Sequence, residues 1–144
     1  MQLTRYTDYS LRVLIYLAVH QDQLATIEEI AEAYDISKAH LMKIVHQLGL
    51  AGYVETVRGR GGGLRLARPP QKIRIGEVVR HTEEMVVVEC FDPKTSHYRI
   101  QPACELRGVL KEALDAFLRT LDGYTLADLV ARRREPLARL FRAS

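Results

Sequence analysis

A short glycine-rich segment that carries two arginines constrains the fold of this chain more than any other feature. Arg58-Gly59-Arg60-Gly61-Gly62-Gly63 separates two runs of alternating apolar and polar residues, Tyr53–Val57 and Leu64–Leu66. Such runs on either side of a glycine-rich turn predict an antiparallel β-hairpin with a basic tip. Glycine permits positive φ angles and close approach of another backbone, so this tip can contact a phosphodiester. A loop that holds nucleotide phosphates would need a lysine–serine pair and a following helix, and the sequence has neither.

The residues before this hairpin predict two short helices joined by a tight turn. Thr26 and Glu29 have the spacing of a capping box and open the first of these helices. Asp35-Ile36 forms the turn, and Ser37 caps the next helix, which runs from about Lys38 to Leu50. The inward side of that helix is apolar: Leu41, Ile44, Val45 and Leu48. A helix-turn-helix followed directly by a basic hairpin is a winged helix-turn-helix.

The outward side of the second helix and the hairpin tip form the predicted DNA-contacting surface. Between Ile36 and Arg68 there are six basic residues and one acidic residue, a local net charge of +5, although the whole chain has a net charge of only +3. Clustered positive charge indicates a polyanionic partner, because each neutralised phosphate releases counterions. We expect the second helix to enter the major groove and the hairpin arginines to lie along an adjacent minor groove. The predicted contact residues are Ser37, Lys38, His40, Lys43, Arg58, Arg60 and Gly62.

Helical periodicity predicts further helices on both sides of the winged region. The first helix is expected from about Asp8 to His20, with Thr7 as its N-cap. A short helix is expected from Ile75 to about Glu83, and a long one starts near Cys104. The long helix carries an apolar stripe at helical spacing: Leu106, Val109, Leu110, Ala113, Leu114, Phe117, Leu118 and Leu121. We favour packing of this stripe against a partner helix in a homodimer that binds a palindromic double-stranded operator; the alternative is that it covers the protein's own core.

The chain is therefore expected to be mainly α-helical with a small β wing, in three parts. These are a winged helix-turn-helix DNA-binding domain (1–70), a connector and sensor loop (71–103), and a dimerisation helix with a short C-terminal helix (104–144). The Arg132-Arg133-Arg134 run is expected to be a solvated helix face. The sequence has no apolar run of about 20 residues and no signal peptide pattern, so we expect a cytoplasmic protein with no membrane segment. It contains no recognisable catalytic motif, so we expect neither an enzyme nor a small-molecule substrate.

Several motifs along nearly the whole chain resemble, in order and spacing, those of the winged-helix iron–sulfur regulators of the NsrR/IscR family. They are Met1-Gln2-Leu3-Thr4, Thr7-Asp8-Tyr9, Ala51-Gly52-Tyr53-Val54, Val57-Arg58-Gly59, Gly62-Gly63, Ile73-Arg74-Ile75-Gly76-Glu77-Val78-Val79, Pro102-Ala103-Cys104 and Tyr124-Thr125-Leu126-Ala127-Asp128-Leu129. The resemblance implies a homodimeric transcription factor, most often a repressor, whose operator affinity depends on an iron–sulfur cluster. In NsrR-type members the cluster reacts with nitric oxide. Cysteines in the loop before the dimerisation helix hold it.

The cysteine content departs from the family pattern. The family's loop carries three cysteines, whereas this chain has only Cys90 and Cys104, with thirteen residues between them. Tyr98 stands in the place of the central cysteine, and His97 lies beside it. A cluster normally has four protein ligands. The resemblance implies Asp8 as a ligand across the dimer, and His97 is a further candidate. Two cysteines favour a two-iron cluster and leave a four-iron cluster open.

Each of these candidate ligands also has a simpler explanation. Asp8 can be an acidic residue in a helix's first turn, His97 an exposed loop side chain, and Cys90 a small buried residue. Cys104, at the start of a helix, can carry a thiolate that serves redox chemistry instead of ligation. The alternative function is thus a repressor of the same fold that has lost the cluster and responds to thiol oxidation, a small molecule or a protein partner. A winged helix used for protein–protein assembly is disfavoured by the local positive charge.

Overall fold

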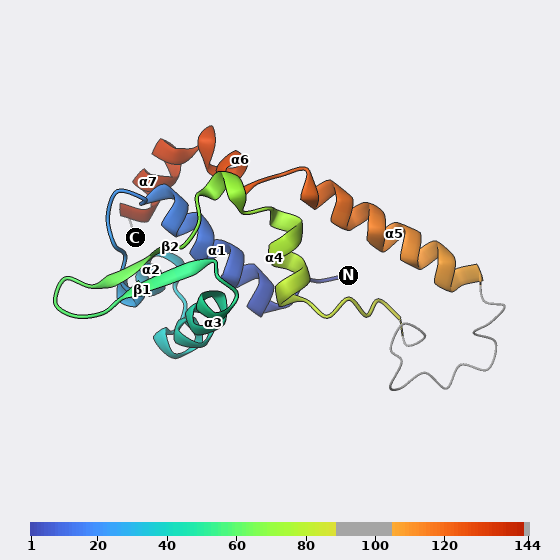
Figure 1. The fold of residues 1–144 in the computed structure, drawn as a ribbon, viewed down its shortest axis with the longest axis horizontal. Helices are drawn as coiled ribbons and strands as arrows, with labels where there is room; N and C mark the ends of the chain where they lie inside the picture. Colours follow the sequence, from blue (N-terminus) through green and yellow to red (C-terminus); the bar gives the residue numbers. More distant parts are fainter. Residues whose placement is uncertain (89–104, 143–144) are drawn as a thin grey trace.

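The structure, a computed structural model, describes residues 1–88 and 105–142 of the 144-residue chain. It is mostly helical with one two-stranded antiparallel sheet, which confirms the predicted fold class. Figure 1 shows the sheet at one end of the long axis and the longest helix reaching away at the other end. Within the described residues, no helix has the length and apolar character that a membrane crossing requires. The elements are α1 (Arg5–Val19), α2 (Ile27–Tyr34), α3 (Lys38–Leu50), β1 (Val54–Val57), β2 (Gly63–Leu66), η1 (Pro70–Lys72), α4 (Ile75–Thr82), α5 (Glu105–Asp122), α6 (Leu126–Ala131) and α7 (Arg134–Arg142).

The caps predicted for α2 and α3 are confirmed. Thr26 and Glu29 form a reciprocal capping box: the Glu29 amide donates to Thr26 Oγ1 over 3.2 Å, and the Thr26 amide donates to Glu29 Oε2 over 2.9 Å. Ser37 Oγ accepts from the His40 amide over 3.3 Å. Asp35, between the two helices, adopts the left-handed conformation (φ 52°) that ends α2. These local contacts set the turn of the helix-turn-helix without help from distant residues.

The start of α1 differs from the prediction. The helix begins at Arg5 and its N-cap is Thr4, not Thr7. Thr7 lies inside the helix, fully buried, and its amide donates to Thr4 Oγ1 over 3.3 Å. Both threonines can cap a helix, but capping at Thr4 adds a turn that places Thr7 in the interior.

Helix α1 is the centre of the hydrophobic core. Val13, Leu14 and Leu17 are at most 2% exposed, and α3, α4, α6, α7 and β2 all contact this helix. The apolar side of α3 faces it as predicted, with Leu41 and Ile44 fully buried. The core therefore fixes which side of α3 remains outward.

The wing consists of β1, β2 and the turn of residues 58–62 between them, and the chain before α2 anchors it. Val54 pairs with Leu66 and Val57 with Gly63 in an antiparallel register. Ala25 adds a short bridge to β2: its amide donates to Leu64 O over 3.0 Å, and the Leu64 amide donates to Ala25 O over 2.7 Å. A Cβ on Gly63 would lie only 2.6 Å from Ala25 O, so this close approach requires glycine.

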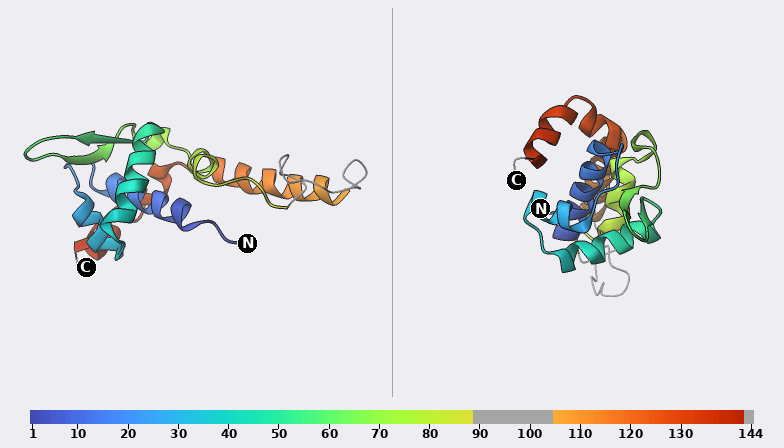
Figure 2. Two further views of the ribbon diagram at one scale, coloured as in Figure 1. Left: turned by 90° about the horizontal axis from the view of Figure 1, so that it is seen from below. Right: turned by 90° about the vertical axis from the view of Figure 1, so that its left-hand side faces the viewer.

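The C-terminal residues form two helices where the sequence predicted one. Helix α6 ends at Ala131 and α7 begins at Arg134, and both lie back against α1 (Figure 2). The arginine run therefore spans the junction between them and is not one solvated helix face. Arg134 Nε donates to Val19 O over 3.2 Å, and the Phe141 ring lies 4.9 Å from that of Tyr16. Whether residues 104–144 act as a separate unit remains a prediction.

The apolar stripe of α5 serves its own core over only part of its length. Leu118 is 6% exposed, and Leu114, Phe117 and Leu121 pack partly buried against the same core. In the N-terminal half of the helix, in contrast, Leu106 is 57% and Val109 61% exposed. The predicted helix start at Cys104 lies outside the described residues.

A polar joint fixes the other end of α5 to the winged region. Arg80 on α4 donates from Nη1 and Nη2 to the two carboxylate oxygens of Asp122, over 2.6 and 2.8 Å. Arg74 Nη1 donates to Asp122 O over 2.8 Å. The hydrogen bond from Arg80 holds the pKa of Asp122 below its usual range. Gly76 lies directly beneath this carboxylate, and a Cβ there would collide with Asp122 Oδ1.

We expect Gly76→Ala to lower the midpoint of thermal unfolding by several degrees. An added methyl group must push the Asp122 carboxylate away from Arg80, and the fold loses the stabilisation that this part-exposed bidentate pair provides. Gly49→Ala on α3 is the control, since the nearest atom to an added Cβ is Val54 O at 3.7 Å, an ordinary contact. The control should unfold at the wild-type temperature or slightly above it. Equal melting of Gly76→Ala and wild type by circular dichroism would refute the tight joint.

Candidate nucleic-acid interface

The outward side of α3 is polar, apart from an exposed Met42 near its start and an exposed Leu50 at its end. Lys38 and Lys43 are exposed, as predicted, and Gln47 is exposed as well. Met42 is 59% exposed and lies one turn after Lys38. An exposed methionine on a helix that presents lysines can contact thymine methyl groups. Helical spacing alone places Met42 on the outward side, but Met42 is not among the contact residues predicted from the sequence.

Two predicted contact residues also have structural roles. Ser37 is exposed, and its hydroxyl caps α3. His40 is half-buried, because its ring meets the edge of the Tyr9 ring on α1 at 5.1 Å between centroids. Ser37 therefore orients the first turn of α3, and His40 joins that turn to α1.

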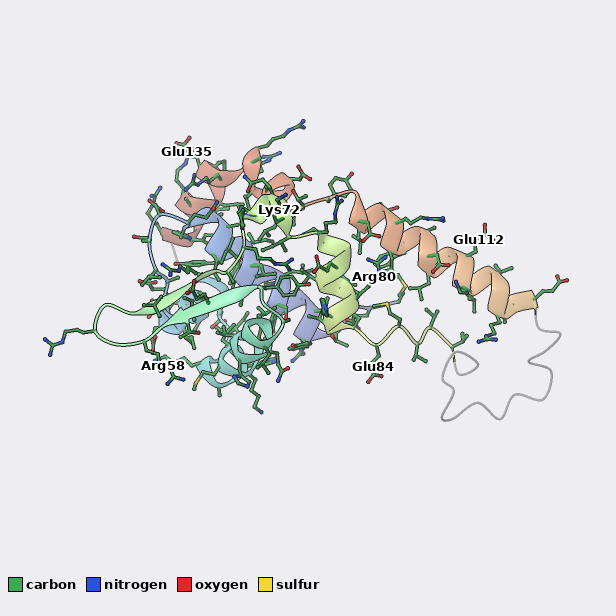
Figure 3. All side chains as sticks on the ribbon, viewed as in Figure 1. Arg58, Lys72, Arg80, Glu84, Glu112 and Glu135 are labelled. Carbon is green, nitrogen blue, oxygen red and sulfur yellow. The ribbon has the colours of Figure 1, made fainter. Side chains whose placement is uncertain are left out.

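The wing presents two arginines on a tightly closed turn. Arg58 and Arg60 are exposed, and Arg58 projects from the wing into solvent (Figure 3). Gly59 and Gly61 adopt positive φ angles of 103° and 74°, which other residues rarely adopt. Gly62 lies on the inner side of the turn, where a Cβ would collide with Val57 O. The glycines thus shape the tip on which the arginines are carried.

The start of α3 and the wing border one shallow groove of about 360 Å³. Its walls come from the start of α2, the first turns of α3 and both strands of the wing: Thr26, Ile27, Glu28, Lys38, Met42, Thr56, Val57, Gly63 and Leu64. The Ala25–Leu64 bridge holds these walls together at the base. We define the α3–wing surface as Lys38 and Met42, which line this groove, together with the exposed Lys43 on α3 and the exposed Arg58 and Arg60 on the wing turn.

Ion pairs reduce the positive charge of this region. Lys38 Nζ lies 3.1 Å from Glu28 Oε1, and Arg65 Nε lies 2.9 Å from Glu55 Oε2. Arg68 Nη2 lies 3.3 Å from Glu77 Oε1. Two of these carboxylates, Glu28 and Glu77, come from outside the basic segment, so the sequence sum of +5 did not include them. Among the described residues, the basic side chains of the segment that form no ion pair are Lys43, Arg58 and Arg60.

The base of the wing is tied to α4 through a buried tyrosine. The Tyr53 hydroxyl lies 2.6 Å from His81 Nδ1, and the Arg68 guanidinium lies over the Tyr53 ring at 4.6 Å. Burial raises the pKa of Tyr53 to about 12, so this phenol stays protonated at neutral pH. The wing is thereby fixed at its base while its tip stays exposed.

The predicted metal ligands are only partly within the described residues. Cys90, His97 and Cys104 lie outside them. Asp8 lies on α1 with its side chain 46% exposed, and Arg12 holds both of its carboxylate oxygens: Nη2 to Oδ2 over 2.9 Å and Nε to Oδ1 over 3.1 Å. Residues 1–88 and 105–142 contain no group of three or more histidine, cysteine or acidic side chains that could hold a metal ion. The structure thus places Lys38 and Met42 in one groove with the wing strands and leaves the metal site untested.

Comparison with known sequences gives a consistent match over most of the chain. The model of the Rrf2 family, described as iron-dependent transcriptional regulators, matches residues 3–132. The HTH-type transcriptional regulator NsrR of Bacillus subtilis (strain 168) is 56% identical over 137 residues, which cover 94% of each chain. NsrR of Bacillus licheniformis is 54% identical over 132 residues, or 90% of this chain and 92% of the relative.

Comparison with solved structures gives the same fold. IscR of T. potens superposes with a TM-score of 0.76 at 25% identity and covers 94% of this chain and 90% of that one. CymR (YrzC), the global cysteine regulator of B. subtilis, gives a TM-score of 0.73 at 26% identity, with 92% and 98% covered. These matches extend over the winged region and α5 alike.

Proposed function

Because this chain belongs to the Rrf2 family of transcriptional regulators, we propose that the α3–wing surface is where it binds operator DNA. Like these relatives, the chain is a DNA-binding transcriptional regulator, and it is not an enzyme. One observation carries the assignment of the surface. The start of α3 and the two wing strands line a single groove, and the turn between those strands carries the unpaired Arg58 and Arg60, so one duplex can reach all of them. We propose that the protein acts in the cytoplasm as a repressor.

Each part of the surface has a distinct role in this proposal. Helix α3 enters the major groove, where Lys38, Met42 and Lys43 reach base edges and phosphates. Arg58 and Arg60 lie along the adjacent minor groove, which attracts arginine where it is narrow. Ser37 and His40 contact the duplex near the start of α3, while their structural contacts keep that turn in place. Gly62 lets the wing backbone come close to a phosphate.

We further propose that two chains bind a palindromic operator as a homodimer. The exposed N-terminal half of α5 supports this, since Leu106 and Val109 would otherwise remain in water. Figure 1 shows this half of the helix extending away from the winged region, clear of the wing. A two-fold pair of such helices places two α3–wing surfaces on one duplex, which matches the symmetry of a palindrome.

We propose an iron–sulfur cluster held by Cys90 and Cys104 together with Asp8 of the partner subunit, with His97 as a further candidate ligand. Two thiolates with a carboxylate or imidazole suit iron, and two cysteines favour the two-iron form. The start of α5 is the end of that helix away from the winged region (Figure 1). The family resemblance, and not the position of Asp8 on α1, assigns this carboxylate to the second subunit. When bound, such a cluster would make the protein reactive toward nitric oxide or sensitive to the redox or iron state of the cell.

The residues around Asp8 suggest how its engagement would reach the DNA. Arg12 holds the Asp8 carboxylate, and its guanidinium lies over the rings of Tyr9 and Tyr34, at 5.5 and 5.8 Å. Tyr9 in turn contacts His40 in the first turn of α3. A change in the partners of Asp8 is therefore linked by three contacts, through Arg12 and Tyr9, to His40 in the first turn of α3.

We expect Lys43→Ala, Arg58→Ala and Arg60→Ala each to weaken binding to duplex DNA. Each variant that loses a phosphate contact should reduce the slope of log affinity against log salt by about 0.9. Fluorescence anisotropy with a mixed-sequence duplex at several salt concentrations measures this slope. Arg139→Ala, on α7, removes one positive charge that is paired with Glu135 and should leave the slope unchanged. Wild-type affinity and slope in all three wing and α3 variants would refute the surface.

We expect Val109→Glu to convert the dimer to a monomer at micromolar concentration. A charge placed among apolar side chains at an interface has no partner and loses its hydration. Sedimentation velocity measures the mass in solution. Arg119→Glu, exposed on the same helix but outside the apolar stripe, should remain dimeric. A wild-type protein that is monomeric, or a Val109→Glu variant that stays dimeric, would contradict the proposed interface.

We expect protein purified without oxygen to contain iron and to absorb visible light, and Cys90→Ala to lose both. Asp8→Ala should retain less iron, whereas Asp22→Ala, an exposed carboxylate after α1, should retain the wild-type content. Iron analysis and the visible spectrum report on the ligands without a DNA-binding assay. Colourless, iron-free wild-type protein would instead support a repressor that responds to thiol oxidation, a small molecule or a protein partner.

A further inference from the structure

We propose that Glu28 is a positioning residue that competes with DNA phosphate for Lys38 and so lowers the sequence-independent affinity of the protein for DNA. The inference rests on the proposed α3–wing surface and adds a residue that no sequence motif indicated. Glu28 lies in the first turn of α2, ten residues before Lys38, and reaches across to the start of α3. It is an acidic side chain in the wall of the groove where the duplex is expected to bind.

The contact between these two side chains has the geometry of a charge-assisted hydrogen bond. Lys38 Nζ donates to Glu28 Oε1 over 3.1 Å. A hydrogen bond from its own backbone amide and then the Lys38 ammonium lower the pKa of Glu28, so the carboxylate is charged at neutral pH. The side chains are 60% and 58% exposed. An ion pair so open to water is weakly held and can exchange one anion for another.

Glu28 differs from the other two carboxylates that pair with this basic segment. Glu77 holds Arg68 at the base of the wing, where the guanidinium covers the Tyr53 ring. Glu55 pairs with Arg65 directly across the wing strands, and neither residue lines the groove. Of these three carboxylates, Glu28 alone lines the groove beside α3.

A phosphate that approaches Lys38 must therefore displace a carboxylate already in place. In the free protein Lys38 contributes little attraction, because Glu28 neutralises it, and the carboxylate itself repels the phosphate. Sequence-independent binding depends almost wholly on phosphate contacts, so the loss falls directly on that mode. The pair thus leaves Lys43, Arg58 and Arg60 to provide most of the attraction to any duplex.

The test measures mixed-sequence duplex binding by Glu28→Gln, Lys38→Gln and the double variant over a range of salt concentrations. The probe is a duplex of about 25 base pairs, long enough for two half-sites one helical turn apart. We expect Glu28→Gln to bind several-fold more tightly at low salt, with a slope of log affinity against log salt that is steeper by up to about 0.9. In the Lys38→Gln background the same substitution should leave the slope unchanged, because no ammonium is released.

Glu135→Gln is the matched control, since it removes a glutamate that is ion-paired with Arg139 on α7, outside the α3–wing surface (Figure 3). It should bind DNA as the wild type does. Unchanged affinity in Glu28→Gln would overturn the inference, and so would an equal gain in the Lys38→Gln background, which indicates repulsion independent of Lys38. Glu28 is not part of the α2 capping box, so its replacement should leave the melting temperature unchanged. If Glu28→Gln has no effect while Arg58→Ala weakens binding, only this inference fails.

Discussion

The close backbone contact between the wing and the chain before α2 is the constraint on which the proposed interface depends. Ala25 and Leu64 exchange two hydrogen bonds, and Gly63 is the residue that lets the two backbones come so near. A hairpin attached only through its own strands would be free to swing, since two strands alone are marginally stable. The bridge ties it to the start of α2, while the capping of α2 and α3 fixes the angle between those helices. Wing and recognition helix can then act as one surface because this backbone bridge, together with the contacts of Tyr53 at the base of the wing, holds them in place.

The charge of that surface is set as much by pairing as by composition. A local excess of five positive charges suggested a strong electrostatic footprint, but carboxylates from α2 and α4 neutralise Lys38 and Arg68. The cations that remain unpaired among the described residues of this segment are Lys43 on α3 and the two arginines of the wing tip. Phosphate attraction is therefore concentrated on the parts that enter the grooves. A regulator has to find one site among many, so limiting attraction to arbitrary DNA is as useful as strengthening attraction to its operator.

Local signals in the sequence predicted local structure well, and contacts between elements could not be read from it. Thr26, Ser37 and the glycine-rich turn each define a local element through contacts within a few residues. The order of these elements predicted the fold class. The start of α1 was misplaced because Thr4 and Thr7 are equally good caps, and only the packing that buries Thr7 decides between them. The division into α6 and α7 depends on Arg134 reaching a carbonyl of α1, more than a hundred residues earlier. The Glu28–Lys38 pair could not be predicted from the sequence for the same reason, since it forms only when α2 and α3 pack together.

The two halves of helix α5 have different packing roles, but in the sequence both halves belong to one continuous apolar stripe. Its C-terminal half packs on the protein's own core, and Asp122 fastens that end to α4 through Arg80 and Arg74. Its N-terminal half leaves Leu106 and Val109 for a second chain in the proposed dimer. A helix that is rigidly fixed at one end transmits any movement of its other end to the winged region as a whole. Because two half-sites lie about one helical turn apart on DNA, a small rotation of paired α5 helices would change operator affinity without altering either α3–wing surface.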